Sequence, residues 1–306
     1  MSPYTYVQNS YLYMVSFIHL CLAFTGGATI AREIMRETSY NRAQLAHFVD
    51  DNEPKLTPDQ RAAYATVIDT INTGQGGVVF IDAPGGTGKT FLLNLILANI
   101  RARGDVALAT ASSGIAATLL QGGRTAHSTF KIPIHLIPKE EQVCSIKKGS
   151  AMATLLKMCK VIVWDEATMS NKLALEAVER TFQDIREISA PFGGIAMVFS
   201  GDFRQTLPVV RGGTRANEVD ACFKASKLWE HVQVMHLSTN MRVHLHADTL
   251  AGKFADVLLK IGEGSIPISS AVDCIRIPPE SGNVVDTIEE VKAEFFSALH
   301  KNYLNA

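Results

Sequence analysis

The chain has 306 residues, a length that corresponds to roughly two domains. Hydrophobic residues make up 47% of the sequence, which excludes disorder as a description of the whole chain. The 29 Lys and Arg residues balance the 30 Asp and Glu residues. The net charge of −1 therefore excludes a protein held on nucleic acid or membrane by bulk positive charge alone, while a local basic groove remains open.

The first part of the chain is an apolar leader that carries no charged residue before Arg32. Residues 11–24 are apolar except for Ser16 and His19, but they are too few for a membrane-spanning helix, which needs about 20. A signal peptide is the alternative, yet no Lys or Arg precedes the stretch. We expect a helix packed on the domain surface or facing a partner, and no stable membrane association. Residues 31–51 are polar and predict further helix.

The cysteines argue for a reducing compartment. There are five of them, widely spaced and without a CxxC pair. An odd number with this spacing disfavours a disulfide framework or a zinc site. They are Cys21, Cys144, Cys159, Cys222 and Cys274. The cytosol or the nucleus is the simpler location.

From residue 56 onward the pattern predicts alternating helices and strands. Thr57 as cap and Pro58 at the first helical position predict a helix that ends near Ile71. The predicted strands are 78–81, 106–109, 161–164, 195–199 and 232–237, and the later helices are 89–103, 114–120 and 173–188. Continuous apolar runs indicate strands buried on both faces, as in a parallel sheet. Their alternation with helices predicts a doubly wound α/β domain.

A glycine-rich segment, APGGTGKT, joins the first of these strands to a helix. Glycines let backbone N–H groups curl around phosphate oxygens, and the helix N-terminus adds positive potential. Lys89 is expected to reach the terminal phosphates, and the Thr90 hydroxyl to bind Mg²⁺. The residues assigned to nucleotide binding here are Gly85, Gly86, Thr87, Gly88, Lys89 and Thr90. Ala83 stands where the strict P-loop pattern has Gly, but the strand–loop–helix context disfavours a turn that binds nothing.

Two carboxylates, Asp165 and Glu166, end the strand at 161–164. Asp165 is expected to hold Mg²⁺ through water, and Glu166 to orient and deprotonate the attacking water. Adjacent side chains on a strand point to opposite faces, so we expect the two to diverge. Alone, such a pair is an ordinary solvated turn. Downstream of a P-loop it predicts nucleoside triphosphate hydrolysis.

Further polar segments follow the other strands. Residues 110–117 and 123–130 mix small, hydroxyl, basic and aromatic side chains, which suits single-stranded nucleic acid, although core packing is the alternative for His127 and Phe130. Gln205 follows the fourth strand, where it can sense a γ-phosphate; its alternative is a polar turn. Arg242 follows the fifth strand, where it can act as an arginine finger; its alternative is a surface salt bridge.

Taken in order, five runs resemble the ATPase half of the Pif-type DNA helicases, superfamily-one enzymes that move 5′ to 3′, in the branch that includes Helitron helicases. The runs are APGGTGKTFL, ASSGIAATLLQGGRTAHSTFKIP, WDEATM, GDFRQTLPVV and LSTNMR, within residues 56–243. The resemblance implies an α/β fold, a RecA-like P-loop NTPase domain with a mainly parallel sheet. It implies ATP and Mg²⁺ as cofactors, and single-stranded DNA and tailed duplex DNA as partners.

The resemblance also implies roles for single residues. Gln60 is the adenine-reading glutamine, Gln205 the γ-phosphate sensor that couples nucleotide to DNA, and Arg242 the finger residue. Lys89, Thr90, Asp165 and Glu166 keep the roles given above. The residues in the family's motifs that contact the DNA strand are Ser113, Gly114, His127 and Ser128. DNA repair, recombination and telomere maintenance in the nucleus, and location in the mitochondrion, are further implications of the resemblance.

The domain organisation follows from where these motifs stop. We expect a helical leader at 1–51, the ATPase domain at 52–243, and at 244–306 the start of a truncated second region, because the family's late motifs have no match after Arg242. An ATP- and DNA-binding remnant that cannot unwind alone is therefore an alternative to a working helicase. A P-loop kinase or a small-molecule ATPase is a third class, disfavoured by the ASSGIAATLL and GDFRQTLP runs.

Overall fold

The computed structural model describes residues 27–137, 141–241, 249–266, 268–269, 274–275 and 285–295. The chain divides into two compact units, Met1–His246 and Ala247–Ala306. The apolar segment at 11–24 lies outside the described residues. Within the described part of the chain, no helix has the length and apolar character needed to cross a membrane.

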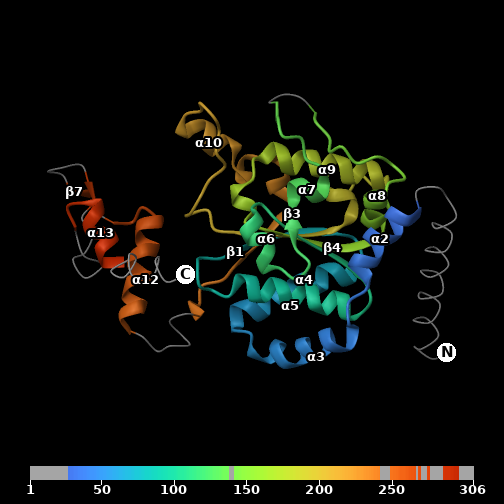
Figure 1. Ribbon diagram of the computed structural model, residues 1–306, viewed down its shortest axis with the longest axis horizontal. Helices are drawn as coiled ribbons and strands as arrows, with labels where there is room; N and C mark the ends of the chain where they lie inside the picture. Colours follow the sequence, from blue (N-terminus) through green and yellow to red (C-terminus); the bar gives the residue numbers. More distant parts are fainter. Residues whose placement is uncertain are drawn as a thin grey trace, which may run out of the picture. The chain divides into compact units, whose positions relative to one another are not determined.

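In the described part of the first unit, six parallel strands form one sheet (Figure 1). They are β1 (Gly77–Asp82), β2 (Val106–Ala111), β3 (Arg124–Thr125), β4 (Cys159–Asp165), β5 (Ala196–Gly201) and β6 (Val232–His236). Their order across the sheet is β3-β2-β4-β5-β1-β6. Because all six run in the same direction, their carboxyl ends share one edge of the sheet, and ligands of open α/β sheets bind at that edge.

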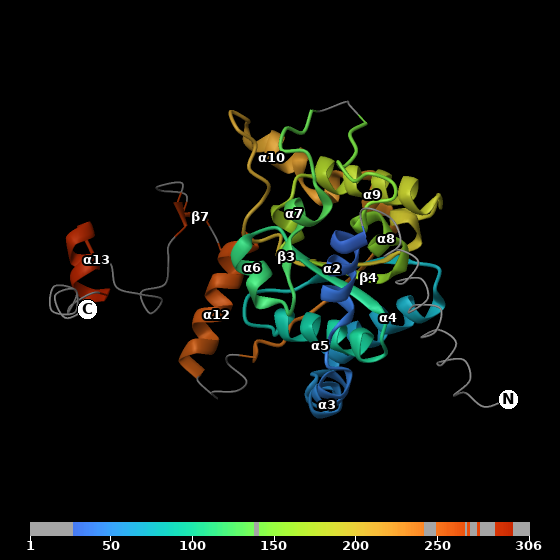
Figure 2. The ribbon, with the colours of Figure 1, turned by 45° about the vertical axis from the view of Figure 1, so that its right-hand side comes forward.

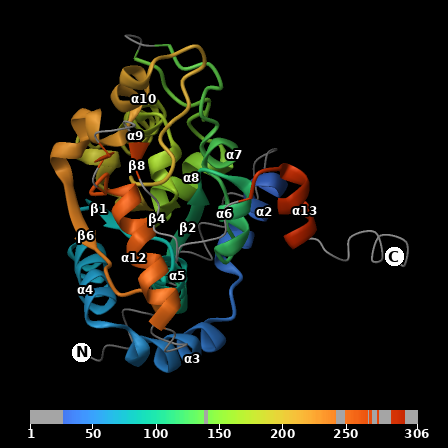
Figure 3. The ribbon, with the colours of Figure 1, turned by 90° about the vertical axis from the view of Figure 1, so that its left-hand side faces the viewer.

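Helices cover both faces of this sheet (Figures 1 and 2). One face carries α3 (Arg42–Asn52), α4 (Pro58–Thr73) and α5 (Lys89–Ala102). The other carries α7 (Ala126–Phe130), α8 (Ala151–Met158) and α9 (Lys172–Arg186). The same two layers are seen when the molecule is turned by 90° (Figure 3). This arrangement confirms the predicted doubly wound α/β domain.

Each strand contributes side chains to both helix layers, because successive side chains point to opposite faces of the sheet. In β1, Val78 and Phe80 pack into the core under α9, whereas Val79 and Ile81 pack into the core under α5. A strand of this kind has no polar face, which is why its sequence is a continuous apolar run. The prediction of strands buried on both faces is confirmed.

The predicted start of α4 is confirmed in detail. The Thr57 side chain accepts a hydrogen bond from the backbone N–H of Gln60, and the Gln60 side chain accepts one from the backbone N–H of Thr57. This reciprocal capping box closes the first turn. The helix ends at Thr73, two residues past the predicted end, and Gly74 follows in a left-handed conformation with φ of 68°.

Several short elements were not predicted. They are β3, α7, α8, α10 (Arg215–Ala221) and the 3₁₀ helices Glu53–Lys55, Ala167–Met169, Pro191–Gly194, Phe223–Ala225 and Lys227–His231. The helix predicted at 114–120 is present as α6 (Gly114–Leu119), one residue shorter than predicted. The polar segment predicted as helix at 31–51 forms two helices, α2 (Gly27–Thr38) and α3. The break falls before Asn41, whose side chain accepts a hydrogen bond from Gln44 and caps α3. α2 packs on α8, and α3 packs on α5.

A buried ion cluster attaches α2 to the sheet. Glu37 is only 2% exposed, and its carboxylate lies 3.2 Å from Arg124 at β3 and 4.0 Å from Arg101 at the end of α5. The Arg101 guanidinium lies 4.3 Å from the ring centroid of Tyr40 and donates to the Ala107 carbonyl. We call Glu37, Arg101 and Arg124 the leader cluster. It joins three segments that are far apart in sequence.

The second unit contains, in its described residues, α12 (Thr249–Gly262), α13 (Ile288–Phe295) and the strands β7 (Ile268–Ser269) and β8 (Cys274–Ile275). The two strands pair in antiparallel fashion.

Candidate active site

The segment between β1 and α5 has the geometry of a phosphate-binding loop. Gly86 and Gly88 adopt positive φ angles of 88° and 77°, which favour glycine. A side chain at Gly88 would meet Gln60 Nε2 at 2.6 Å, so the loop also needs glycine there for space. Thr87 is buried, and its hydroxyl donates to the Pro84 carbonyl at 2.8 Å. Lys89 then opens α5, so the loop leads directly into a helix N-terminus.

Three charged groups meet beside this loop. Lys89 Nζ lies 2.6 Å from Glu166 Oε1 and 3.4 Å from Asp165 Oδ1. The expectation that the two carboxylates diverge is therefore wrong. β4 ends at Asp165, and Glu166 turns into a left-handed conformation with φ of 52°, which brings its side chain back toward the same lysine.

The surroundings of Asp165 fit a hard cation. This carboxylate is 2% exposed, and its Oδ1 accepts hydrogen bonds from Ser200 Oγ at 2.7 Å and from the Glu166 backbone at 2.9 Å. Thr90 brings a hydroxyl to the first turn of α5. Carboxylate and hydroxyl oxygens are the donors that Mg²⁺ prefers, so this pair suits the metal predicted from the sequence.

Gln60 lies against the phosphate loop. It is 2% exposed, and its Nε2 donates to the Thr87 carbonyl at 2.8 Å while its Oε1 accepts from Thr57 N. Its carboxamide thus has partners on both atoms. Nε2 carries a second N–H and Oε1 a second lone pair, so these bonds are compatible with the adenine-reading role expected from the sequence.

Asp59, one position earlier, was missed by the sequence reasoning. Its Oδ2 accepts hydrogen bonds from the backbone of Ser238 at 2.8 Å and of Thr239 at 3.2 Å, and its Oδ1 accepts from Thr57 and from Gln60 N. Burial by itself would raise the pKa of Asp59, but these donors outweigh it and hold the pKa well below its usual range. Asp59 thereby fixes the segment that follows β6. Because an acid in a first helical turn is common, its sequence position alone gave no signal.

The same segment also touches the phosphate loop. The Met241 backbone N–H donates to the Gly86 carbonyl at 2.8 Å. Arg242, the predicted finger residue, lies outside the described residues.

Gln205 lies at the carboxyl end of β5, close to the loop. A side chain at Gly85 would come within 4.0 Å of its Nε2. The carboxamide donates to Asp202 Oδ2 at 2.9 Å, and Asp202 Oδ1 in turn accepts from Arg204 Nε at 2.7 Å. Asp202 and Arg204 were not singled out from the sequence.

The four residues assigned to DNA contact follow β2 and β3. Ser113 caps α6 by accepting from Ala116 N, and a side chain at Gly114 would meet open space. His127 and Ser128 are exposed on α7. Phe130 is completely buried between Trp164 and Phe182. Core packing, the alternative for Phe130, is therefore correct for this residue.

Hydrogen bonds join the end of β2 to the backbone and ring at the end of β4. The Ser112 backbone N–H donates to the Asp165 carbonyl at 3.0 Å, and Trp164 Nε1 donates to Ser112 Oγ at 3.0 Å. The residues assigned to nucleotide and to DNA therefore share one edge of the sheet.

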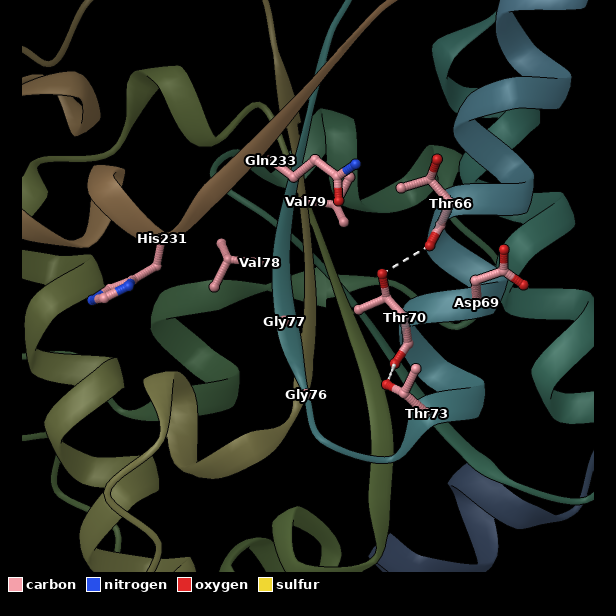
Figure 4. A pocket seen from close by; sticks show the side chains of 10 residues that line it. All are labelled: Thr66, Asp69, Thr70, Thr73, Gly76, Gly77, Val78, Val79, His231 and Gln233. Atoms are coloured by element: carbon pink, nitrogen blue, oxygen red, sulfur yellow. Dashed lines mark hydrogen bonds between the residues drawn. The ribbon is translucent and has the colours of Figure 1, made fainter.

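A separate open hollow of about 490 Å³ lies at the amino ends of β1 and β6 (Figure 4). It is away from the phosphate loop, because the loop follows the carboxyl end of β1. Thr66, Thr70 and Thr73 line it from α4, but each hydroxyl donates to a carbonyl of its own helix. These three hydroxyls are therefore already hydrogen-bonded within α4.

Comparison with known proteins identifies the family. Residues 55–271 match the model of the PIF1-like helicase family. The chain is 32% identical to the ATP-dependent DNA helicase Pif1 of Bdellovibrio bacteriovorus over 72% of this chain and 46% of that protein. It is 32% identical to human ATP-dependent DNA helicase PIF1 over 58% and 26%. The crystal structure of Bacteroides Pif1 bound to single-stranded DNA superposes with a TM-score of 0.53 at 25% identity, covering 69% of this chain and 47% of that one.

The chain spans less than half the length of these three relatives. The shared region includes the sheet, the phosphate loop and the carboxylate pair, and the fold is that of the RecA-like Pif1 helicase domain. The chain belongs to the PIF1-like helicase family.

Proposed function

We propose that this chain is the ATP-hydrolysing core of a DNA helicase, which couples ATP turnover to 5′-to-3′ movement along single-stranded DNA. The observation that carries the proposal is the meeting of Lys89 with Asp165 and Glu166 beside a glycine-rich loop at a helix N-terminus. In this arrangement Lys89, the cation that would bind the phosphates, donates a hydrogen bond to Glu166, the base that would deprotonate water.

The chemistry assigns a step to each residue. The loop N–H groups bind the phosphates, and Lys89 exchanges Glu166 for phosphate oxygens as ATP enters. The released Glu166 carboxylate accepts a proton from the water that attacks the γ-phosphate, giving ADP and inorganic phosphate. Asp165 and Thr90 would hold Mg²⁺, which supplies charge neutralisation when bound.

DNA binding is assigned to the segments that follow β2 and β3. Exposed His127 and Ser128, and the open backbone at Gly114, fit a strand that lies across this edge. Pif1 relatives bound to single-stranded DNA support the same substrate for this chain. The proposal extends to tailed duplex DNA as a further substrate. It also extends to repair, recombination and telomere maintenance as pathways, and to the nucleus and mitochondrion as locations. Movement of the chain relative to a second lobe would convert turnover into steps.

A DNA-stimulated ATPase assay tests the proposal. We expect phosphate release by the full chain to rise on addition of single-stranded DNA, and Lys89→Ala to lower it by about a hundredfold or more, since the phosphates lose their main cationic contact. Lys148→Ala is the matched control, because Lys148 is an exposed lysine that pairs with Asp184 on the surface at 2.9 Å. It should leave turnover unchanged.

Three outcomes separate the alternatives. Turnover that is indifferent to DNA would contradict the proposal and favour a P-loop ATPase of another kind. Binding of both ATP and DNA without turnover would favour a remnant that lacks activity. Unwinding of a 5′-tailed duplex in preference to a 3′-tailed one would establish the polarity.

A further inference from the structure

Five polar side chains form a continuous row across the carboxyl ends of β5, β1 and β6. In order they are Gln205, Asp202, Arg204, Asp82 and His236. We call this set the strand-end row. Of these five, only Gln205 has a role expected from the sequence, that of γ-phosphate sensor. The other four have none, although two of them are carboxylates placed beside a site for a highly anionic ligand.

The inner end of the row fixes the Gln205 carboxamide. Asp202 is 4% exposed, and its Oδ2 accepts one of the two N–H bonds of Gln205 Nε2 at 2.9 Å. Its Oδ1 accepts from Arg204 twice, from Nε at 2.7 Å and from the backbone N at 3.1 Å. With one N–H bonded to Asp202, the plane of the amide is set and the second N–H is directed elsewhere.

Asp202 is an anion at neutral pH. Burial by itself would raise its pKa, but the hydrogen bonds from Arg204 and Gln205 outweigh burial, and the pKa lies below its ordinary value. An ionised acceptor holds the Gln205 amide more strongly than a neutral acid would.

The outer end of the row extends through Arg204 to the next two strands. Arg204 Nη2 lies 3.5 Å from Asp82 Oδ1, a buried atom that has no hydrogen-bond partner in the described part of the chain. Asp82 Oδ2 lies 3.2 Å from His236 Nδ1. Asp82 immediately precedes the phosphate loop, and its backbone carbonyl accepts from Leu237 N at 2.9 Å. The Arg204 guanidinium therefore lies between carboxylates from two different strands.

This geometry gives Arg204 two effects. Its single positive charge offsets part of the negative charge of Asp82 and Asp202. It also ties the orientation of Asp202, and through it the Gln205 amide, to the strand that carries the phosphate loop. A buried carboxylate that lost this partner would be under-compensated and would change its position or its protonation.

We propose that Arg204 and Asp82 are positioning residues that hold the carboxamide of Gln205, through Asp202, in the direction of the γ-phosphate. The inference rests on the proposed role of Gln205 as γ-phosphate sensor. It predicts that breaking the row lowers DNA-stimulated kcat while the KM for ATP stays nearly unchanged, because the phosphate loop itself is intact. Misdirected groups of this kind lower rates by about tenfold to a hundredfold.

The test is a double-mutant cycle on the full chain. The variants are Arg204→Gln, Asp82→Asn, Gln205→Ala and the two double variants with Gln205→Ala. Arg211→Gln is the matched control, because Arg211 is an exposed arginine in the same loop. DNA-stimulated kcat and KM for ATP are measured for each, with the unfolding temperature as the check on folding. If Arg204→Gln does not fold, Arg204→Lys keeps the charge and replaces it in the cycle.

We expect Arg204→Gln to lower kcat by at least tenfold with a KM change below about threefold, and to cost nothing further in the Gln205→Ala background. Equal losses in both backgrounds would overturn the inference, because Arg204 would then act independently of Gln205. Unchanged kcat in Arg204→Gln and Asp82→Asn, with Gln205→Ala impaired, would also overturn it. Full turnover in Gln205→Ala would refute the sensor role expected for Gln205, and the inference with it, while the proposed ATPase function would stand.

Discussion

Glu37→Ala is the change that most directly tests how the leader helix α2 is held on the sheet. The substitution removes the only carboxylate of the leader cluster and leaves Arg101 and Arg124 facing each other without their shared partner. The Arg101 side chain is fully buried, so water cannot solvate its guanidinium in place of the lost Glu37 carboxylate. We therefore expect a large loss of stability from a residue that lies outside the matched family region.

The size of the loss follows from the burial of the partners. Removing one member of a buried ion pair costs about 3–5 kcal/mol. Arg124 keeps 22% of its side chain exposed, which lets water compensate in part and places the estimate at the lower end, about 3 kcal/mol. For a unit of this size, 1 kcal/mol shifts the unfolding midpoint by about 2–4 °C, so Glu37→Ala should lower it by about 6–12 °C.

Tryptophan fluorescence during thermal unfolding measures this midpoint, and the same signal during urea unfolding measures the loss of unfolding free energy. Both tryptophans, Trp164 and Trp229, lie in the first unit, so the signal reports the unit that contains the cluster. Glu230→Ala is the matched control, because Glu230 is exposed. It should unfold at the wild-type midpoint.

Unfolding of Glu37→Ala at the same urea concentration as Glu230→Ala would refute a stabilising role for the Glu37 carboxylate. A finer check is the double variant Glu37→Ala with Arg124→Met. Direct coupling predicts an interaction free energy of about 0.5–3 kcal/mol between the two changes. Strict additivity would show that the pair contributes nothing together.

Three further predictions follow from the active site and the core. Glu166→Gln should lower kcat by about 10²–10⁴-fold with ATP still bound, as measured by single-turnover hydrolysis beside nucleotide titration; an unchanged kcat would exclude Glu166 as the base. Asp202 has a lowered pKa, so it binds fewer protons in the folded state than in the unfolded state, and its contribution to stability is lost as the pH falls below about 4. Asp202→Asn should therefore show a smaller drop in urea midpoint than wild type between about pH 5 and pH 3. An equal drop in the two proteins would contradict this. Burial raises the pKa of Cys144 to about 11 and that of Cys159 to about 12, so these two thiols should react with a thiol reagent near pH 8 only after unfolding; rapid labelling of either one in the native chain, located by peptide mapping, would disprove it.

The phosphate loop could be predicted because all of its signals are local. Glycine spacing, Lys89 and Thr90 lie within eight residues, and the strand before them has a purely apolar pattern. The strands and long helices were predictable for the same reason, since periodicity acts over neighbouring residues. β3 and α7, which have two and five residues, are too short to produce a period.

Contacts between distant segments explain what the sequence could not show. Asp59 and Ser238 are 179 positions apart, and Glu37 and Arg124 are 87 apart. Nothing in either local pattern indicates the partner. The direction of Glu166 was mispredicted because one residue with positive φ overrides the alternation of a strand. Phe130 lies in a motif that suggests contact with nucleic acid, yet burial of its ring in the aromatic core decides its position.

The two margins of the sheet are unequal, and this affects how the molecule behaves in solution. β3 offers only two residues at one margin, too few to template another chain, whereas β6 offers five at the other. Among the described residues β6 pairs with β1 alone, so its outer backbone row is the place where intermolecular strand pairing would begin. Exposed Gln233 and His236 on this strand work against such pairing. Replacing them with valine would convert a tolerated margin into an aggregation site, a point for anyone who redesigns this domain for expression.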